Sequence, residues 1–233
     1  MYTKRHLNIE NGKGVLMTSI NEEYITEYIR ELLPERTPFL SELENYAKEN
    51  KVPIIEPEIA QFLRFLLKLH RPKEILEVGT AIGYSAITMA ETLKDNFQIT
   101  SLEKDPDMIE EAILNIEKAG FKDQIKIIEG DALETFPHLS KHYDFIFLDA
   151  AKGQYIEFMD YSLKLLKPGG IIVSDNVLYK GLVAKKSQVQ RRQRTLVTRL
   201  RDYLEMINHI EGVTSSVIPI GDGLALTYKE EIY

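Results

Sequence analysis

The sequence predicts an α/β fold with a mostly parallel sheet, a helical extension before it and an antiparallel hairpin at its end. After Pro72, short β-branched segments alternate with amphipathic helices, a pattern typical of β-α-β units. The segments FIFL and IIV are apolar at every position, as strands buried on both faces are. Near the end of the chain, two β-like segments flank Gly221, Asp222 and Gly223, which favours a hairpin at one edge of the sheet.

The alternation fixes the expected elements of the core. Strands are expected at 74–79, 98–103, 126–130, 143–149 and 171–175, and with the two hairpin strands they make a seven-stranded sheet. Helices are expected at 84–93, 106–119, 131–139, 154–166 and 188–208. Pro168, Gly169 and Gly170 are expected to stop the helix over 154–166.

The residues before Pro72 predict a helical cap. Three segments with helical apolar spacing follow one another between Asn21 and His70: EEYITEYIRELL, PFLSELENYAKEN and PEIAQFLRFLLKLH. Residues 1–16 are polar with two glycines and are expected to form a flexible tail. We therefore expect a single domain over 17–233, divided into a cap over 17–70 and a core over 71–233.

Composition excludes several classes of protein. The chain has no Cys, so it has no disulfide, thiolate metal site or cysteine nucleophile. No apolar run approaches the roughly 20 residues of a membrane span, and the start lacks the apolar segment of a signal peptide. We therefore expect a cytoplasmic protein without a membrane partner.

Charge is distributed unevenly. The net charge of −7 argues weakly against a polyanionic partner. The stretch from Tyr179 to Arg201 is nevertheless basic throughout and holds no Asp or Glu. Its basic residues are Lys180, Lys185, Lys186, Arg191, Arg192, Arg194, Arg199 and Arg201.

The ends of the first three strands predict a nucleoside-type ligand. The first strand runs into EVGTAIGYS, whose G-x-x-x-G spacing differs from the G-x-G-x-x-G of dinucleotide sites. Glu77 can face the ammonium group of an amino acid. Glu103, at the end of the second strand, can accept both hydroxyls of a ribose. Asp131, next to Ala132 after the third strand, is placed for an adenine amino group; either glutamate alone is equally explained as a loop cap.

The fourth and fifth strands end in residues suited to a metal. Asp149 and the pair Asp175 and Asn176 come together at one edge if the strands are adjacent and parallel. Two carboxylates and an amide oxygen suit a hard divalent cation such as Mg²⁺. An Asp-Asn pair alone is explained by a turn, but its combination with Asp149 and Lys152 favours a metal.

The segments LEVGTAIGYSA, SLEKD and EGDA resemble the class I S-adenosylmethionine-dependent methyltransferases. From about Glu22 to Tyr228 the chain is similar to the cation-dependent O-methyltransferase family that includes catechol and caffeoyl-CoA methyltransferases. The resemblance implies a Rossmann-like methyltransferase fold, S-adenosylmethionine and Mg²⁺ (or another divalent cation) as cofactors, and a homodimer. It implies cofactor contacts by Ile55, Glu77, Gly79, Ser85, Glu103, Asp131, Ala132 and Asp149, a metal held by Asp149, Asp175 and Asn176, and Lys152 as general base.

Elementary chemistry agrees with these roles. A lysine beside a divalent cation has its ammonium form disfavoured, so its pKa falls toward the working range. The cation also lowers the pKa of a coordinated hydroxyl, which can then attack the sulfonium methyl group. A substrate with two adjacent oxygens is implied.

Three substrates meet that requirement: a catechol, an acyl-CoA phenol and 5-hydroxyuridine, whose 5-hydroxyl neighbours a carbonyl oxygen. The segments AAKGQY, DNVLYKGLVA and RRQR resemble the bacterial tRNA 5-hydroxyuridine methyltransferase branch, which acts at the wobble position of the anticodon. The resemblance implies a tRNA anticodon loop as partner. Candidate contacts are the stacking residues Tyr155 and Tyr179 and the phosphate ligands Lys180, Arg191, Arg192 and Arg194.

Other interpretations of the basic segment stay open. It can be the solvated face of an amphipathic helix, or it can bind the phosphates of coenzyme A in a small-phenol methyltransferase. A non-catalytic RNA-binding module would also explain it. That module gives no reason for Asp149, Lys152, Asp175 and Asn176 to occur together.

Overall fold

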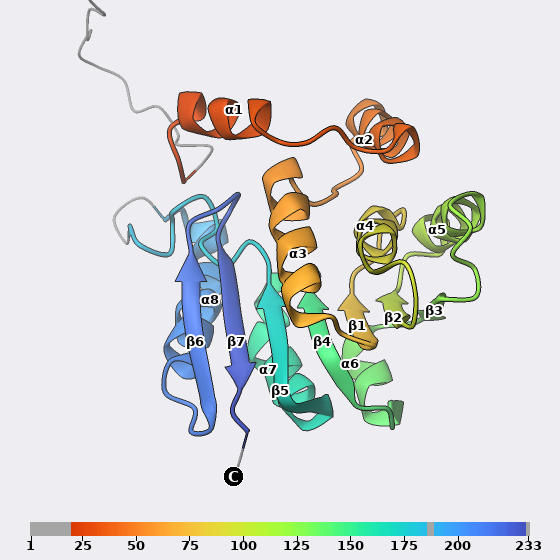
Figure 1. Ribbon diagram of the computed structural model, residues 1–233. Coiled ribbons are helices and arrows are strands. Elements are labelled where there is room, and N and C mark those ends of the chain that lie inside the picture. Colours follow the sequence, from red (N-terminus) through yellow and green to blue (C-terminus); the bar gives the residue numbers. More distant parts are fainter. Residues whose placement is uncertain (1–19, 186–188, 232–233) are drawn as a thin grey trace, which may run out of the picture.

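The computed structural model describes residues 20–185 and 189–231. It holds a seven-stranded sheet in the order β3-β2-β1-β4-β5-β7-β6 (Figure 1). Strands β1 to β5 pair in parallel, and β7 runs antiparallel to both β5 and β6. The fold class predicted from the sequence is confirmed. The strands are β1 Glu74–Val78, β2 Gln98–Glu103, β3 Ile125–Glu129, β4 Tyr143–Leu148, β5 Leu166–Ser174, β6 Val213–Ile218 and β7 Leu224–Lys229.

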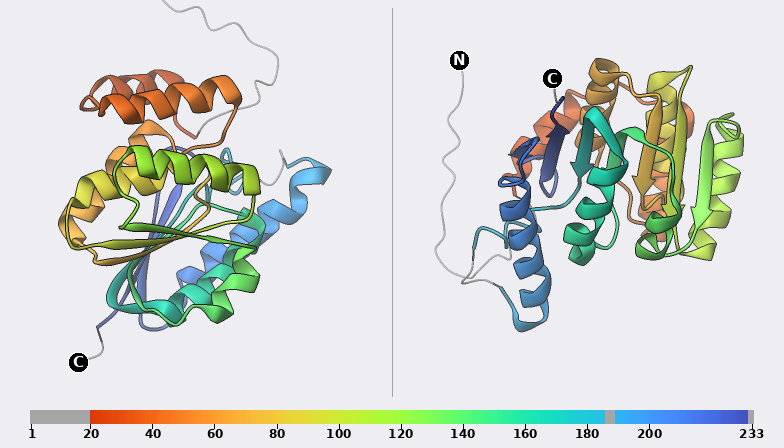
Figure 2. Two further views of the ribbon diagram at one scale, coloured as in Figure 1. Left: turned by 90° about the vertical axis from the view of Figure 1, so that its right-hand side faces the viewer. Right: turned by 90° about the horizontal axis from the view of Figure 1, so that it is seen from below.

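Helices cover both faces of the sheet (Figure 2). On one face, α3, α4 and α5 pack in a cluster that includes Leu63, Ile87 and Phe145. On the other, α6, α7 and α8 pack in a second cluster that includes Phe158 and Tyr203. The helices are α1 Glu23–Glu31, α2 Pro38–Asn50, α3 Pro57–His70, α4 Tyr84–Leu93, α5 Pro106–Lys118, α6 Ala132–Thr135, α7 Tyr155–Leu165 and α8 Arg194–Ile207, with 3₁₀ turns η1 Phe136–His138, η2 Lys152–Gln154 and η4 Arg191–Gln193.

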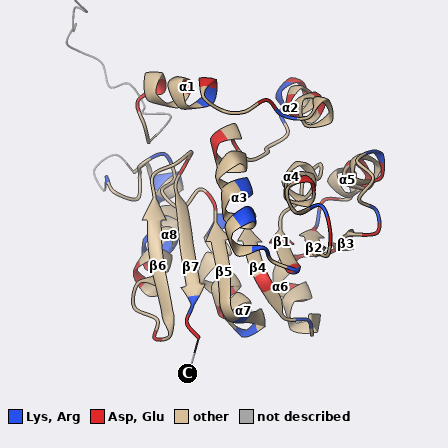
Figure 3. Cartoon of the chain, viewed as in Figure 1, with Lys and Arg blue, Asp and Glu red and all other residues tan. Residues whose placement is uncertain are grey.

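The distribution of charged residues reflects this burial of the sheet between two layers of helices. Charged residues are sparser in the strands than on the helices and loops, and most of those in strands lie in the first two residues of a strand or in its last residue (Figure 3). A parallel sheet covered on both faces has no solvated side, so charged side chains within it would lose their hydration. The buried carboxylate of Glu77 in β1 is the exception that bears on the site.

Local sequence signals set the starts of several helices. The Thr37 hydroxyl accepts a hydrogen bond from the Leu40 N–H, and Asp105 accepts from Asp107 and Met108. A proline follows each of these caps in the first turn, where its missing N–H costs nothing. The three helices expected before Pro72 are present.

Three boundaries differ from the prediction. The helix expected over 131–139 is a single turn, α6, followed by η1, because Pro137 cannot donate a helical hydrogen bond. Pro168, Gly169 and Gly170 do not stop α7, which ends at Leu165; they lie inside β5. Pairing of β5 with β4 shifts register between Tyr143 and Phe145, so this stretch is accommodated as an irregularity. The last helix begins at Arg194 after η4, later than predicted.

Some predictions lie outside the described residues, namely the tail over 1–16, the first residues of the cap and Lys186. Among the helices of the described ranges, none combines the length and apolar character needed to cross a membrane. Of the cap, α1 and α2 lie across the end of the sheet where the parallel strands terminate, whereas α3 packs on a face of the sheet (Figure 1). That arrangement places the linker between α2 and α3 over the strand ends.

Candidate active site

A cavity of about 510 Å³ lies at the carboxyl ends of β1, β2, β4 and β5, beneath the linker between α2 and α3. A smaller cavity of about 140 Å³ shares Gly79, Glu103, Ala150 and Ala151 with it and continues to the end of β3. Eight predicted site residues line the larger cavity: Ile55, Gly79, Ser85, Glu103, Asp149, Lys152, Asp175 and Asn176. Asp131 and Ala132 line the smaller one. The two cavities form a trough along the sheet edge, where open parallel sheets bind ligands.

Gly79 allows the floor of the trough to form. Its φ of 94° lies in the left-handed region, and a Cβ there would lie 2.7 Å from the Asp149 carbonyl oxygen and 2.9 Å from the Ala150 Cβ. The loop after β1 therefore packs directly on the end of β4. Any side chain at this position would push the ends of β1 and β4 apart.

Glu103 organises the same loop, the glycine loop from Gly79 to Gly83. One carboxylate oxygen accepts hydrogen bonds from the N–H groups of Thr80 and Ala81, at 3.2 and 3.0 Å. The other accepts from Lys104 and Asp105, at 2.9 and 3.1 Å. The side chain is only partly buried and faces both cavities. Glu103 therefore couples the glycine loop to any ligand that binds its carboxylate.

The structure corrects the prediction for Glu77. Its side chain is 0% exposed and lies beneath the cavity, so it does not face a ligand's ammonium group. Its oxygens accept hydrogen bonds from Thr80 (2.7 Å), Ser85 (2.5 Å) and Ser101. Burial raises the pKa of Glu77, although the three hydroxyl donors oppose the shift. Glu77 thus acts on the cavity indirectly, by orienting Ser85 and Thr80 in its wall.

Asp131 closes the far end of the trough. Its carboxylate accepts a hydrogen bond from the Leu133 N–H at 3.0 Å and so caps α6. Leu102 and Phe158 line the same small cavity. Largely apolar walls, with the acidic group of Asp131 at the end away from Glu103, suit a flat aromatic base that carries an amino group.

Asp149 and Asp175 share one wall of the larger cavity. Burial raises the pKa of Asp149 to about 7, against the opposing charge of Lys152. Burial and then the charge of Asp149 raise the pKa of Asp175. Each carboxylate therefore disfavours ionisation of the other, and a cation between them would relieve both.

The donor set fits a hard divalent cation. The described residues contain no group of three or more His, Cys, Asp and Glu side chains able to hold a metal. The candidate set is instead two carboxylates and the amide oxygen of Asn176, all in one cavity wall. Oxygen donors of this kind suit Mg²⁺ and leave positions for water and substrate.

Tyr155 is a structural residue rather than a stacking surface for a base. It is 1% exposed, and its hydroxyl donates to the carbonyl oxygens of Leu148 (3.1 Å) and Asp175 (2.8 Å). Its ring packs edge-on against Tyr203 at a centroid distance of 5.4 Å. The prediction that Tyr155 stacks on a substrate is wrong for this conformation, because no face of its ring is free. It fixes instead the ends of β4 and β5, which carry the acidic pair.

Lys152 lies on η2 and lines the cavity beside the acidic pair. Sequence reasoning missed the support behind it. Arg199 of α8 donates hydrogen bonds to the Gly153 carbonyl oxygen (2.6 Å) and to Glu157 (3.0 Å). Arg201 donates to the carbonyl oxygens of Val183 (2.7 Å) and Leu182 (3.0 Å). Two cations of the basic segment are therefore structural, which reduces the number available for phosphates.

The remaining predicted substrate residues lie outside the cavity wall. Arg191, Arg192 and Arg194 are exposed on η4 and the start of α8, and within the described ranges their guanidinium groups have no ion-pair partner. Tyr179 is partly buried against the second core cluster. Lys180 is exposed, and its N–H donates to the side chain of Asp222.

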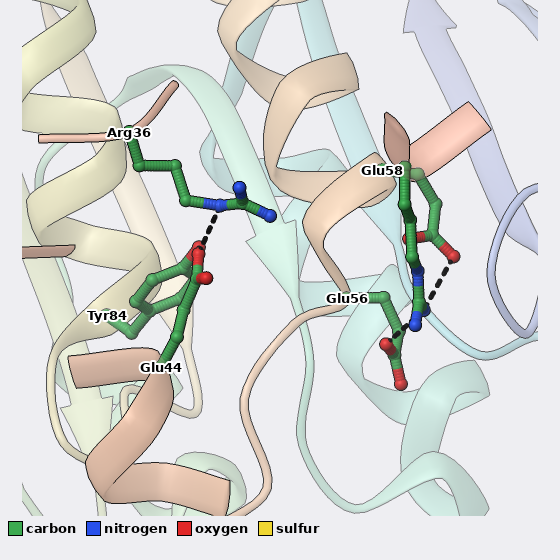
Figure 4. A network of polar contacts seen from close by, with 6 residues as sticks. Arg36, Glu44, Glu56, Glu58 and Tyr84 are labelled. Atoms are coloured by element: carbon green, nitrogen blue, oxygen red, sulfur yellow. Dashed lines mark hydrogen bonds and ion pairs between the residues drawn. The ribbon is translucent and has the colours of Figure 1, made fainter. Parts of the chain in front are cut away.

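Two polar networks tie the cap to the site (Figure 4). The Tyr84 hydroxyl, at the cavity, donates to Glu44 of α2 at 2.5 Å, and Glu44 also pairs with Arg36. In the second, Arg30 of α1 binds Glu58 (2.7 Å) and the cavity-lining Glu56 (2.5 Å) at the start of α3. No short motif signals these contacts, because they join different helices and the segments beside them.

Fold and site together define an α/β enzyme that binds a nucleoside cofactor at the sheet edge beside an acidic pair and a lysine. A family model described as O-methyltransferase matches residues 31–230. A caffeoyl-CoA O-methyltransferase from Populus kitakamiensis is 33% identical over 229 residues, covering 92% of this chain and 95% of the relative. A catechol O-methyltransferase from Niastella koreensis is 36% identical over 174 residues, covering 72% and 79%.

Solved structures of O-methyltransferases are similar to this chain as well. The O-methyltransferase from Bacillus cereus in complex with SAH has a TM-score of 0.79 and 26% identity, covering 89% of this chain and 97% of that chain. TomG from Streptomyces achromogenes, an O-methyltransferase of tomaymycin synthesis in complex with SAM, has the same score and identity and covers 89% and 96%. The chain therefore belongs to this family of S-adenosylmethionine-dependent O-methyltransferases, as the motifs EVGTAIGYS and SLEKD predict.

Proposed function

We propose that this protein methylates the 5-hydroxyl of 5-hydroxyuridine at the tRNA wobble position to give 5-methoxyuridine, with S-adenosylmethionine as donor and a divalent cation. The observation that carries the chemistry is the common cavity wall formed by Asp149, Lys152, Asp175 and Asn176, beside a trough with the dimensions and polarity of a nucleoside site. A cytoplasmic site of action follows from tRNA as the substrate.

The roles divide along the trough. Ser85 and Ile55 would hold the methionine part of the cofactor, Glu103 the ribose, and Asp131 with Ala132 the adenine. Asp149, Asp175 and Asn176 would hold the cation, whose chemistry is to lower the pKa of a bound hydroxyl. Lys152, in its neutral amine form, would accept the hydroxyl proton, and the resulting oxyanion would attack the sulfonium methyl group in line. The methyl–sulfur bond would break as the methyl–oxygen bond forms, so that S-adenosylhomocysteine leaves with the electron pair. Most of the protein's contribution is alignment of these groups.

The acceptor is proposed from geometry around the cavity. The 5-hydroxyl and 4-carbonyl oxygens of 5-hydroxyuridine are adjacent and can both face the cation. Arg194 precedes Arg199 by five residues, about 7.5 Å along the axis of α8, and Arg199 contacts the turn that carries Lys152. The exposed residues Arg191, Arg192 and Arg194 therefore lie at or just before the start of the helix that packs on the turn carrying Lys152. Their guanidinium groups suit the phosphates of an anticodon loop.

A small phenolic acceptor is the second candidate. The observation that favours it is that relatives at 33% and 36% identity are named as caffeoyl-CoA and catechol O-methyltransferases. In that case the same arginines would contact the phosphates of an acyl-CoA. Charge alone does not separate these acceptors.

Label transfer separates them. Purified protein with Mg²⁺ and methyl-labelled S-adenosylmethionine is offered tRNA from cells lacking 5-methoxyuridine, then caffeoyl-CoA, then a panel of catechols. We expect labelling of the tRNA and recovery of 5-methoxyuridine by nucleoside mass spectrometry. Labelling of the phenols without tRNA would transfer the assignment to the second candidate.

We also propose that the protein is a homodimer. Helix α1 has no buried residue. Its residues Tyr24 and Tyr28 and its C-cap residue Leu32 are 69%, 61% and 65% exposed. On α3, Phe65 and Leu69 are 61% and 72% exposed. An apolar helix face that no described residue of the same chain covers suits a second copy. Sedimentation of the protein and of a Tyr28→Glu variant checks this; a monomeric wild-type protein at micromolar concentration would contradict it.

A further inference from the structure

The loop after β5 is held in an unfavourable conformation. Asn176, Tyr179 and Lys180 have φ values of 55°, 44° and 54°, in the left-handed region that non-glycine residues rarely adopt. Such a conformation is unfavourable for a residue with a Cβ, so the surroundings must impose it. Asn176 is also a proposed ligand of the cation, so whatever imposes the loop also sets the metal site.

The turn between β6 and β7 supplies that constraint. The Val177 N–H donates to the Gly223 carbonyl oxygen at 2.9 Å, and the Leu178 N–H donates to the Asp222 carbonyl oxygen at 3.0 Å. The Lys180 N–H donates to the carboxylate of Asp222. Three N–H groups in four residues of the loop are therefore bound by two adjacent residues of one turn.

The turn is itself fixed. Gly223 donates its N–H to the Ile220 carbonyl oxygen at 2.8 Å. A Cβ on Gly221 would collide with the Ile59 side chain, and one on Gly223 would lie 2.5 Å from Leu178. The turn is packed between α3 and the loop with no room for side chains at these glycines. It is therefore a firm support rather than a loose hairpin tip.

We propose that Asp222 is a positioning residue that clamps the loop 176–180 and thereby places Asn176 for the cation, an inference that rests on the metal site of the proposed function. Two of the three hydrogen bonds use backbone carbonyl groups and persist in any variant. The third uses the Asp222 carboxylate and is removable by mutation. A hydrogen bond to a charged acceptor is stronger than a neutral one, so its loss should be measurable.

Charge offers a rival explanation. The Asp222 carboxylate interacts electrostatically with Lys152, Lys180, Glu56 and Asp175, and a carboxylate so placed can act on a cation through its charge alone. Asp222→Asn separates the two explanations, because the amide keeps an oxygen that accepts the Lys180 N–H but carries no charge. Asp222→Ala removes both.

The first measurement is Mn²⁺ binding to the full-length protein by electron paramagnetic resonance, for wild type, Asp222→Asn, Asp222→Ala and Thr214→Ala. Thr214 is a control on the same hairpin, where its hydroxyl donates to Glu230 away from the loop. We expect Asp222→Ala to weaken Mn²⁺ binding about tenfold, and the Asn and Thr214 variants to stay within about twofold of wild type. Calorimetry should show unchanged S-adenosylmethionine affinity in all four proteins.

Equal weakening by Asn and Ala would show that charge acts, and would overturn the clamp. Unchanged Mn²⁺ binding in Asp222→Ala would overturn it as well. The second measurement needs no metal: amide exchange by nuclear magnetic resonance should show a protected Lys180 N–H in the wild type, and loss of protection in the Ala variant only. An unprotected Lys180 amide in the wild type would overturn the clamp even if the Ala variant fails to fold. A wild type that binds no Mn²⁺ but protects this amide would refute the metal site and leave the clamp standing.

Discussion

The guanidinium group of Arg199 donates a hydrogen bond to the carbonyl oxygen of Gly153, 2.6 Å away, in the residue that follows Lys152. Helix α8 therefore reaches across to the short turn that carries the proposed general base. An η2 turn of three residues has few hydrogen bonds of its own, so its orientation depends on such outside contacts.

Arg199→Ala should lower kcat about tenfold without changing the affinity for S-adenosylmethionine, because Lys152 loses its alignment while the cofactor wall is untouched. Steady-state kinetics and calorimetry check the two halves. Glu157→Gln is the matched control: it removes the ion pair with Arg199 but leaves the bond to Gly153. If the Gln variant is equally impaired, the ion pair and not the carbonyl contact is responsible.

Glu103→Ala should weaken S-adenosylmethionine binding at least tenfold. The substitution removes a ribose acceptor, two hydrogen bonds from the glycine loop and two from the residues that follow β2. Titration calorimetry in the presence of EDTA is the measurement, since this end of the trough needs no metal. Glu129→Ala is the control, because Glu129 pairs with Glu103 in register on β3 but is exposed and lines neither cavity. Unchanged affinity in the Glu103 variant would remove this residue from the site.

Methyl transfer should stop in EDTA and return when Mg²⁺ or Mn²⁺ is added, since the candidate ligands are hard oxygen donors. Asp175→Ala should behave as the chelated wild type does, at less than about 1% of full activity. Assays with labelled cofactor in chelator-treated buffer measure this. Full activity without a divalent cation would refute the metal mechanism while leaving the family assignment intact.

Acid stability should depend on Asp144. Partial burial alone would raise the pKa of this carboxyl, but hydrogen bonds from Lys167 and from the N–H groups of Glu74 and Lys73 outweigh burial and lower it. Because the pKa of Asp144 is lower in the folded than in the unfolded protein, its ionisation stabilises the folded state at pH values above the unfolded pKa of about 3.8. This stabilisation is lost as the pH falls through the folded pKa. Asp144→Asn should cost about 2 kcal/mol at pH 7 and much less near pH 3.

Urea unfolding at the two pH values gives the comparison. Asp123→Asn serves as the control, because this aspartate is exposed and its carboxylate holds no strand end. An Asp144 variant whose loss of stability is the same at pH 3 and pH 7 would show that geometry, rather than ionisation, accounts for the effect.

Apolar runs were sufficient to predict strands and layers, because burial on both faces leaves a continuous signal in FIFL and IIV. The site was predictable where a residue ends a strand, as Glu103 does, or directly follows one, as Asp149 and Asp175 do. The role of a residue within a strand was harder to predict. Glu77 lies in β1 itself, where pairing with Ser101 and burial decide which way the carboxylate points. Tyr155 and Arg199 have functions set by distant neighbours, and a single sequence does not record those contacts.

Charge reversal of Arg191, Arg192 and Arg194 to Glu should abolish methylation of tRNA but leave cofactor binding unchanged. These side chains are exposed and lie outside both cavities, so the cofactor site does not depend on them. Removing cations that neutralise phosphates should also reduce the steepness with which tRNA affinity falls as salt rises, because fewer counterions are released on binding.

The control reverses the charge of Lys118, Lys122 and Lys126, which lie between the end of α5 and the edge strand β3. This variant changes the net charge by the same amount at another place on the molecule. Nucleoside mass spectrometry of tRNA from a deletion strain complemented with each version is the readout. We expect 5-methoxyuridine with wild type and control and none with the arginine variant; 5-methoxyuridine at wild-type level with the arginine variant would show that these three residues do not hold the tRNA.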